Sequence, residues 1–85
     1  MAYVIRYTER ALKYLESLDK HLAQQMYKKI KKVEENPLRS IERLATAELW
    51  KLRIGDYRAI LVLDRAKEEV ITVNIGHRKD IYKNL

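Results

Sequence analysis

The sequence predicts an α+β domain: an N-terminal strand, a two-helix antiparallel hairpin packed on a three- to four-stranded, mainly antiparallel sheet, and a short C-terminal helix. Two observations predict this order. Apolar and polar residues alternate over 2–7 and again over 49–75, as in half-buried strands. Between them, over 9–36, apolar residues recur every three or four positions, as on one face of a helix.

The first half of the chain carries signals for the ends of both helices. Thr8 is suited to cap a first helix over 9–18. Asp19 can cap a second helix, which should end near Asn36 because Pro37 disfavours helical geometry in the residue before it. The short joint between the helices predicts an antiparallel hairpin.

The second half of the chain switches to a period of two, which indicates strands. Three strands are expected, at 49–54, 57–63 and 70–75. Gly55 and Asp56 fit a two-residue hairpin turn between the first two. Gly76 is expected to break the third strand, and the tail at 77–85 to form one or two turns of helix.

Composition limits the possible functions. The chain has 85 residues, with 18 Lys+Arg against 12 Asp+Glu for a net charge of +6, and no cysteine. This length suits a single domain over 1–85. The lack of cysteine excludes disulfide scaffolds, Cys-ligated zinc and thiol catalysis, and two histidines offer little to a transition metal. We therefore expect neither a metal nor a cofactor.

The sequence also bears on location and partners. No apolar run approaches the roughly 18 residues of a membrane span, so we expect a cytoplasmic protein with no membrane partner. The positive charge suits a polyanionic partner, which for a soluble domain is usually nucleic acid. A soluble protein that is simply basic would have the same composition, so charge alone leaves both interpretations open.

The predicted hairpin places two arginines opposite each other. With a two-residue loop, Arg53 faces Arg58 on a polar face that also carries Lys51, while the other face is apolar and should pack on the helices. Like charges directly opposed destabilise a hairpin by up to about 1 kcal/mol. Asp56 or Asp80 could relieve the repulsion, or the side chains could extend into water. Alternatively, a phosphate between the guanidinium groups would make the pairing favourable.

Antiparallel order brings the segment after the third strand to the same end of the sheet. His77, Arg78 and Lys79 should therefore lie near the arginine pair. In a helical tail, Arg78 and Tyr82 would share a face, because they are four residues apart. The candidate cluster is basic and includes a ring that could stack on a base. Its members are Lys51, Arg53, Arg58, Arg78 and Tyr82.

Several segments resemble the RelE branch of the RelE/ParE toxin superfamily, and the resemblance covers essentially the whole chain. They are Met1-Ala2-Tyr3 with Glu9-Arg10-Ala11-Leu12-Lys13, Leu49-Trp50-Lys51-Leu52-Arg53, Gly55-Asp56-Tyr57-Arg58 and Gly76-His77-Arg78-Lys79-Asp80-Ile81-Tyr82. The resemblance implies the toxin of a type II toxin–antitoxin system. Such a toxin would be a ribosome-dependent mRNA endoribonuclease that cuts mRNA in the ribosomal A site without a metal and inhibits translation.

The resemblance also implies the catalytic residues. On matching positions these are a lysine, two arginines and a tyrosine: Lys51, Arg58, Arg78 and Tyr82. Arg53 lies at a commonly basic neighbouring position. Two departures from the family pattern are that Leu49 stands where many members have a further lysine, and that the segment from Arg78 to Tyr82 is shorter than in some members.

These groups suit RNA cleavage by the strand's own 2′-hydroxyl. Lys51 would act as general base, because neighbouring positive charges make a lysine easier to deprotonate. Arg53 and Arg58 would hold the phosphate and its developing charge. Arg78 would act at the leaving 5′-oxygen, and Tyr82 would orient or stack on a nucleotide. The products would be a 2′,3′-cyclic phosphate, or the 3′-phosphate derived from it, and a 5′-hydroxyl.

Other basic residues suit RNA binding. Lys28, Lys31 and Lys32 on the second helix could contact ribosomal RNA phosphates, although such a run is also typical of a solvated helix face. His77 and Lys79 are further candidates for RNA contacts. His77 could instead be an acid or base, or an ordinary loop residue.

The expected partners are a cognate antitoxin protein, the ribosome with its ribosomal RNA, and mRNA. An acidic, amphipathic antitoxin segment could lie on the sheet or beside the helices. Two other functions remain open, because fold alone does not fix function. The ParE branch shares the fold but inhibits DNA gyrase by binding, and a simple RNA-binding domain would carry out no chemistry. The basic cluster favours the nuclease.

Overall fold

The computed structural model describes residues 3–44 and 48–81 of the chain. Its elements follow in the order β1 (Val4–Tyr7), α1 (Glu9–Ser17), α2 (Lys20–Lys31), η1 (Lys32–Glu34), α3 (Pro37–Ser40), β2 (Glu42–Arg43), β3 (Leu49–Ile54), β4 (Tyr57–Asp64) and β5 (Glu69–His77). The element η1 is a short 3₁₀ helix. This is the predicted α+β order, with two additional short helices, η1 and α3, and one additional strand, β2, between α2 and β3.

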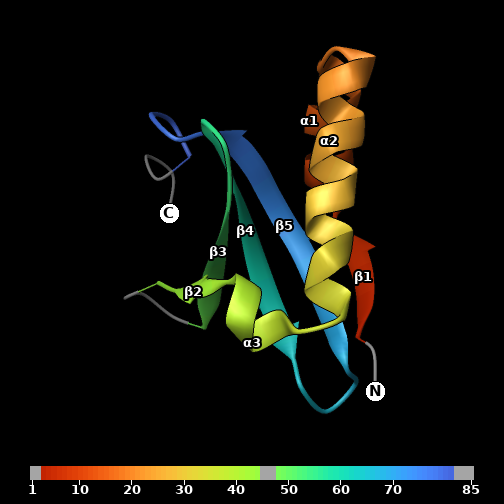
Figure 1. The fold of residues 1–85 in the computed structure, drawn as a ribbon, viewed down its shortest axis with the longest axis vertical. Helices are drawn as coiled ribbons and strands as arrows, with labels where there is room; N and C mark the ends of the chain where they lie inside the picture. The colour runs from red at the N-terminus through yellow and green to blue at the C-terminus, as the bar shows by residue number, and fades with distance from the viewer. Residues whose placement is uncertain (1–2, 45–47, 82–85) are drawn as a thin grey trace.

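Within the described residues, the strands form one five-stranded sheet in the order β1-β5-β4-β3-β2. Strand β1 runs parallel to β5, and the other neighbouring strands are antiparallel. Figure 1 shows α1 and α2 packed along one side of the sheet, next to β1 and β5, with the end of β5 beside the β3–β4 turn. The predicted fold class is confirmed. The sheet is larger than expected because β2, which is too short to show a period, pairs with β3.

Both helices begin where their caps predict. The Thr8 hydroxyl accepts a hydrogen bond from the backbone N–H of Ala11 at 3.2 Å. The Asp19 carboxylate accepts one from the N–H of His21 at 3.0 Å. Each cap satisfies a backbone donor that the first helical turn leaves without an intrahelical partner.

The end of the second helix was predicted wrongly. Helix α2 ends at Lys31 rather than near Asn36, and the chain tightens into η1 before it reaches the proline. Pro37 then occupies the first position of α3, where its missing N–H has no intrahelical role. The proline therefore starts a short helix, and the sequence pattern gave no signal for the earlier change to 3₁₀ geometry.

The β3–β4 hairpin has the predicted register, with Ile54 opposite Tyr57 and Arg53 opposite Arg58. Its apolar face packs on the helices, as expected. The main core contains Leu52, Ile54, Ala59 and Leu61 from the hairpin and Ala11, Leu15, Met26, Ile30 and Val33 from the helical half. This core fixes which face of the hairpin is left for polar side chains.

Gly76 does not break the last strand, contrary to the prediction. Strand β5 continues to His77, and Gly76 pairs with Arg58. A Cβ atom on Gly76 would lie 3.0 Å from Cδ1 of Ile81, so glycine allows the chain after β5 to pass close to the strand. Residues 78–81 form turns in place of the predicted C-terminal helix. The remainder of that predicted helix, at 82–85, lies outside the described residues.

Tyr7 is expected to make the free energy of unfolding depend on pH in the alkaline range. Its ring packs edge-to-face on Tyr27, and burial raises its pKa from 10.0 to about 12, with smaller contributions from Tyr27 and Glu34. Between these values the unfolded chain loses the Tyr7 proton while the folded protein keeps it, so the free energy of unfolding falls as pH rises. Because the ring is only half-buried, the slope should be smaller than about 1.4 kcal/mol per pH unit.

Urea denaturation of the wild type and of Tyr7→Phe at several pH values above 9 measures this effect. The variant keeps the ring but has no hydroxyl to titrate, so its urea midpoint should fall less steeply with pH. Equal slopes for the two proteins would show that Tyr7 ionisation does not contribute.

Candidate functional site

Arg53, Arg58 and Arg78 lie around the β3–β4 turn, at the end of the sheet where the sequence predicted a cluster. The backbone N–H of Arg78 donates to the Asp56 carbonyl at 2.8 Å, which holds the chain after β5 against the hairpin. The Nε atom of Arg78 lies 4.0 Å from the Asp56 carboxylate, and the side chain is 55% exposed. The backbone therefore makes the structural contact, and the guanidinium group faces solvent.

The two opposed arginines have different environments. Arg53 is exposed, whereas Arg58 is only 8% exposed. The Nη1 atom of Arg58 donates to the carbonyls of Gly55 and Tyr57, at 2.7 Å each. Gly55 has a φ of 58°, a left-handed conformation that glycine adopts without strain. Arg58 thus lies along the turn and stabilises it. The register confirms its predicted place opposite Arg53, but its side chain is buried, which the alternating pattern did not indicate.

These contacts also offset part of the repulsion between Arg53 and Arg58. Oxygens of the turn backbone carry partial negative charge, and they accept hydrogen bonds from the Arg58 guanidinium. The Asp56 carboxylate, one of the expected partners, instead lies on the Arg78 side of the turn. The positive charge of Arg58 is retained close to the exposed Arg53 opposite it.

Lys51 lies farther from the turn on β3, beside a residue that sequence analysis missed. Its Nζ is 3.6 Å from Oε2 of Glu42 on β2, and its side chain is 28% exposed. The register places these two residues directly opposite each other. Glu42 escaped notice because a two-residue strand has no hydrophobic period.

His77 is the last residue of β5 and not a loop residue. Its ring packs edge-to-face on Tyr57, with a centroid separation of 5.5 Å. Its Nδ1 accepts a hydrogen bond from the backbone N–H of Lys79 at 3.2 Å. In the neutral ring the proton is therefore on Nε2, which is the donor that the imidazole presents.

The remaining predicted residues are not all part of one surface. Lys28, Lys31, Lys32 and Lys79 are exposed. Among them, Lys32 lines a cavity of about 300 Å³ that Lys51 and Arg53 also line, and Lys28 and Lys31 are not among its described lining residues. Tyr82 lies outside the described residues, so its predicted role has no structural test.

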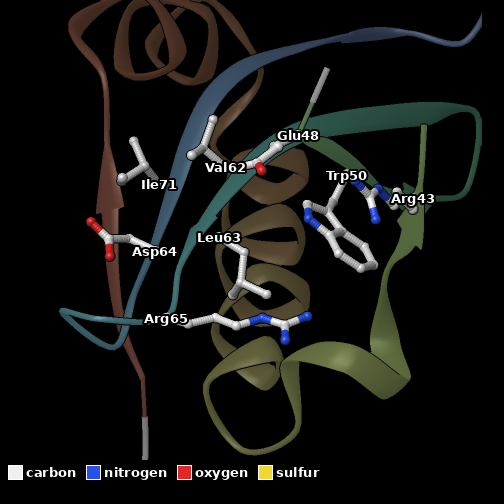
Figure 2. A pocket seen from close by; sticks show the side chains of 8 residues that line it. All are labelled: Arg43, Glu48, Trp50, Val62, Leu63, Asp64, Arg65 and Ile71. Atoms are coloured by element: carbon white, nitrogen blue, oxygen red, sulfur yellow. The ribbon is translucent and has the colours of Figure 1, made fainter. Parts of the chain in front are cut away.

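A larger cavity, of about 610 Å³, lies at the other end of the hairpin (Figure 2). Its basic side chains, Arg43 and Arg65, are matched by Glu48 and Asp64. Figure 2 shows Trp50 beside Arg43, and aliphatic side chains complete the lining. None of the predicted site residues is among its described lining residues, and its balanced charge does not favour a polyanion.

Another cavity, of about 380 Å³, lies between α1 and the end of β5 and is lined by Tyr14 and His77. Burial raises the pKa of Tyr14, and Tyr57 and Asp80 add to the effect. Tyr14 is therefore neutral near pH 7 and can donate a hydrogen bond beside His77, but cannot act there as a base. The sequence pattern placed Tyr14 in a helix but did not indicate that it lies at a cavity.

Across 3–44 and 48–81, no group of three or more His, Cys, Asp or Glu side chains is placed to hold a metal ion. Over the same ranges, the helices are too short or too polar to cross a membrane. The guanidinium, ammonium and imidazole groups of the site suit anion binding. Two carboxylates, Asp56 and Glu42, lie beside Arg78 and Lys51.

The fold closely matches solved toxin–antitoxin structures. A chain of the RelBE2 complex from Mycobacterium tuberculosis gives a TM-score of 0.84 at 23% identity, covering 92% of this chain and 100% of that one. A chain of the archaeal RelE–RelB complex from Pyrococcus horikoshii gives a TM-score of 0.80 at 21% identity, covering 94% of this chain and 99% of that one. A free E. coli RelE mutant gives a TM-score of 0.79 at 28% identity, covering 95% of this chain and 88% of that one. These neighbours define the class as a RelE-type toxin fold.

Sequence comparison identifies the family. Residues 5–82 match the model of the ParE toxin of the type II toxin–antitoxin system, parDE. The chain belongs to this toxin family, and its RelE neighbours place it in the RelE-like branch of the RelE/ParE superfamily. A comparison with curated proteins gives no match.

Proposed function

We propose that this toxin is a ribosome-dependent mRNA endoribonuclease, acting as a single domain over 1–85. It cuts mRNA in the ribosomal A site through the strand's own 2′-hydroxyl, without a metal, and so inhibits translation. The observation that supports this most is the grouping of Arg53, Arg58 and Arg78 at one turn. The turn carbonyls and the Asp56 carboxylate offset part of this positive charge. A phosphodiester has the charge and oxygen geometry to pair with the guanidinium groups that remain exposed.

Each group has its own role in this proposal. The exposed Arg53 and Arg78 hold the scissile phosphate and the charge that builds up on it. Arg58 keeps the turn in shape and adds positive charge behind it. Lys51 takes the proton from the 2′-hydroxyl. Arg78 also stabilises the negative charge on the leaving 5′-oxygen, which takes up a proton from water to give the 5′-hydroxyl. Tyr82 orients or stacks on a nucleotide. The products are a 2′,3′-cyclic phosphate, or the derived 3′-phosphate, and a 5′-hydroxyl.

The proposed partners are a cognate antitoxin and ribosomal RNA. Solved neighbours include RelE with RelB, and E. coli RelE with a RelB peptide. By extension, this chain binds an antitoxin, for which its net charge of +6 favours an acidic protein. Lys28, Lys31 and Lys79 are exposed and would contact ribosomal RNA phosphates.

Primer extension on mRNA translated with and without the toxin tests this function. We expect new 5′ ends inside codons of translated messages, and none on the same RNA without ribosomes. Absence of cleavage with actively translating ribosomes would contradict the proposal.

Gyrase inhibition is the second candidate, because the matching family is described as a ParE toxin. A supercoiling assay with purified DNA gyrase and the same toxin preparation separates the two. Inhibited supercoiling together with intact translated mRNA would favour the gyrase function.

A further inference from the structure

We infer that the cavity between α2 and β3 is a second phosphate site, which holds a phosphodiester flanking the one that is cut. This inference rests on the proposed function, since it takes the substrate RNA strand as ligand. The cavity measures about 300 Å³, and its lining comes from α2, η1, α3, β2 and β3. It is therefore built by elements from both halves of the chain.

The lining has an excess of positive charge. Among the described residues, the cations are Lys29, Lys32, Lys51 and Arg53, and the one carboxylate is Glu42. Glu42 lies 3.6 Å from Lys51, so it offsets one of these charges. Cations that line one cavity repel each other, and an anion bound among them offsets this electrostatic repulsion. This separates the cavity from the charge-balanced one in Figure 2.

The cavity is continuous with the arginine cluster along β3. Lys51 and Arg53 line it, and Arg53 is also opposite Arg58 at the turn. Residues two apart on one strand face are separated by about 6.6 Å, which is comparable to one nucleotide step of an extended chain. A strand with its scissile phosphate at the turn would therefore bring a flanking phosphate toward α2, where Lys29 and Lys32 can meet it.

Size and composition favour a phosphate with part of its ribose over a base. The volume is at the lower limit of ordinary ligand pockets. The uncharged lining consists of Ser40 and Leu52, with no aromatic side chain among the described lining residues on which a base could stack. The site would therefore increase affinity for RNA without selecting a sequence.

An NMR titration of the full-length toxin with a 2′-O-methyl RNA trinucleotide tests this site without cleavage, because the ligand lacks the attacking hydroxyl. We expect amide shifts at Glu42, Lys51 and Arg53.

The double variant Lys29→Ala/Lys32→Ala should bind the trinucleotide about tenfold more weakly. A plot of log K against log salt concentration should become less steep by about 0.7, because one phosphate contact is lost. The matched control, Lys20→Ala/Lys67→Ala, removes the same charge elsewhere and should stay within about twofold.

Glu42→Gln gives an effect of opposite sign, since it removes the one carboxylate from the lining. It should tighten trinucleotide binding by about threefold, whereas Glu16→Gln on α1 should change it little. This pair of variants separates a local effect in the cavity from a general effect of net charge.

Several results would overturn the inference. The first is that the trinucleotide does not bind. The second is that the amide shifts occur only on other surfaces. The third is that the two double lysine variants lose equal affinity for the trinucleotide. Reduced affinity of Lys29→Ala/Lys32→Ala for empty ribosomes, with trinucleotide binding unchanged, would make the cavity a ribosomal RNA contact. Shifts there with an acidic peptide but not the trinucleotide would make it a protein site. These experiments measure binding and not cleavage, so their results can be interpreted even if the nuclease assay fails.

Discussion

Replacing Arg78 with alanine is expected to slow cleavage of translated mRNA by about two to three orders of magnitude, with little change in stability. The guanidinium group is exposed and lies 4.0 Å from Asp56, and an exposed pair of this kind contributes under about 1 kcal/mol. The contact that holds the chain here is the backbone hydrogen bond to the Asp56 carbonyl, and alanine retains it. The lost function would therefore come from the missing positive charge.

Primer extension on translated mRNA gives the rate, and urea denaturation gives the stability of the same preparation. Arg65→Ala is the matched control, because it removes an exposed arginine between β4 and β5, away from the turn. The control should cleave at the wild-type rate. Wild-type cleavage by Arg78→Ala, or its unfolding at much lower urea, would contradict this role for the side chain.

Replacing Arg58 with alanine is expected to reduce both the stability of the protein and its cleavage of mRNA. The free energy of unfolding should fall by about 1 to 3 kcal/mol, because the carbonyls of Gly55 and Tyr57 lose the donor that they share. Cleavage should also be lost, since the turn that carries the cluster is no longer held in place. Arg58→Lys keeps a charge but lacks the planar group that reaches both carbonyls, so its stability should be intermediate.

Arg53→Ala is the comparison that separates these effects. Arg53 is exposed opposite Arg58, so its loss should reduce cleavage while the free energy of unfolding changes by less than about 0.5 kcal/mol. Both variants are compared at a temperature where each is folded. Equal urea midpoints for Arg53→Ala and Arg58→Ala would show that the buried hydrogen bonds of Arg58 do not support the turn.

The parts of the fold that local chemistry determines could be predicted from the sequence. Thr8 and Asp19 cap their helices, and the loop at Gly55 fixes the hairpin register and therefore the Arg53–Arg58 pair. These features depend on neighbouring residues and on a period of two or about 3.6. The position of Arg78 beside the turn followed from strand order alone.

Tertiary contacts decide the features that the sequence did not predict. Gly76 was expected to end a strand, but its role is to let Ile81 approach, which no local pattern reveals. The two opposed arginines are equivalent in the pattern, yet only Arg58 is buried against the turn carbonyls. Lys29 joins Lys51 at one cavity only because α2 and β3 meet in the fold.

The most direct test of the central claim uses ribosomes programmed with a synthetic mRNA whose A-site codon is vacant. We predict cleavage within that codon by the wild-type toxin, with a 5′-hydroxyl and a 2′,3′-cyclic phosphate at the new ends. A single 2′-deoxy substitution at the cleaved nucleotide should abolish the cut, because it removes the attacking oxygen. Cleavage of the deoxy message at the same rate, or no cleavage of the all-ribose message, would contradict the account.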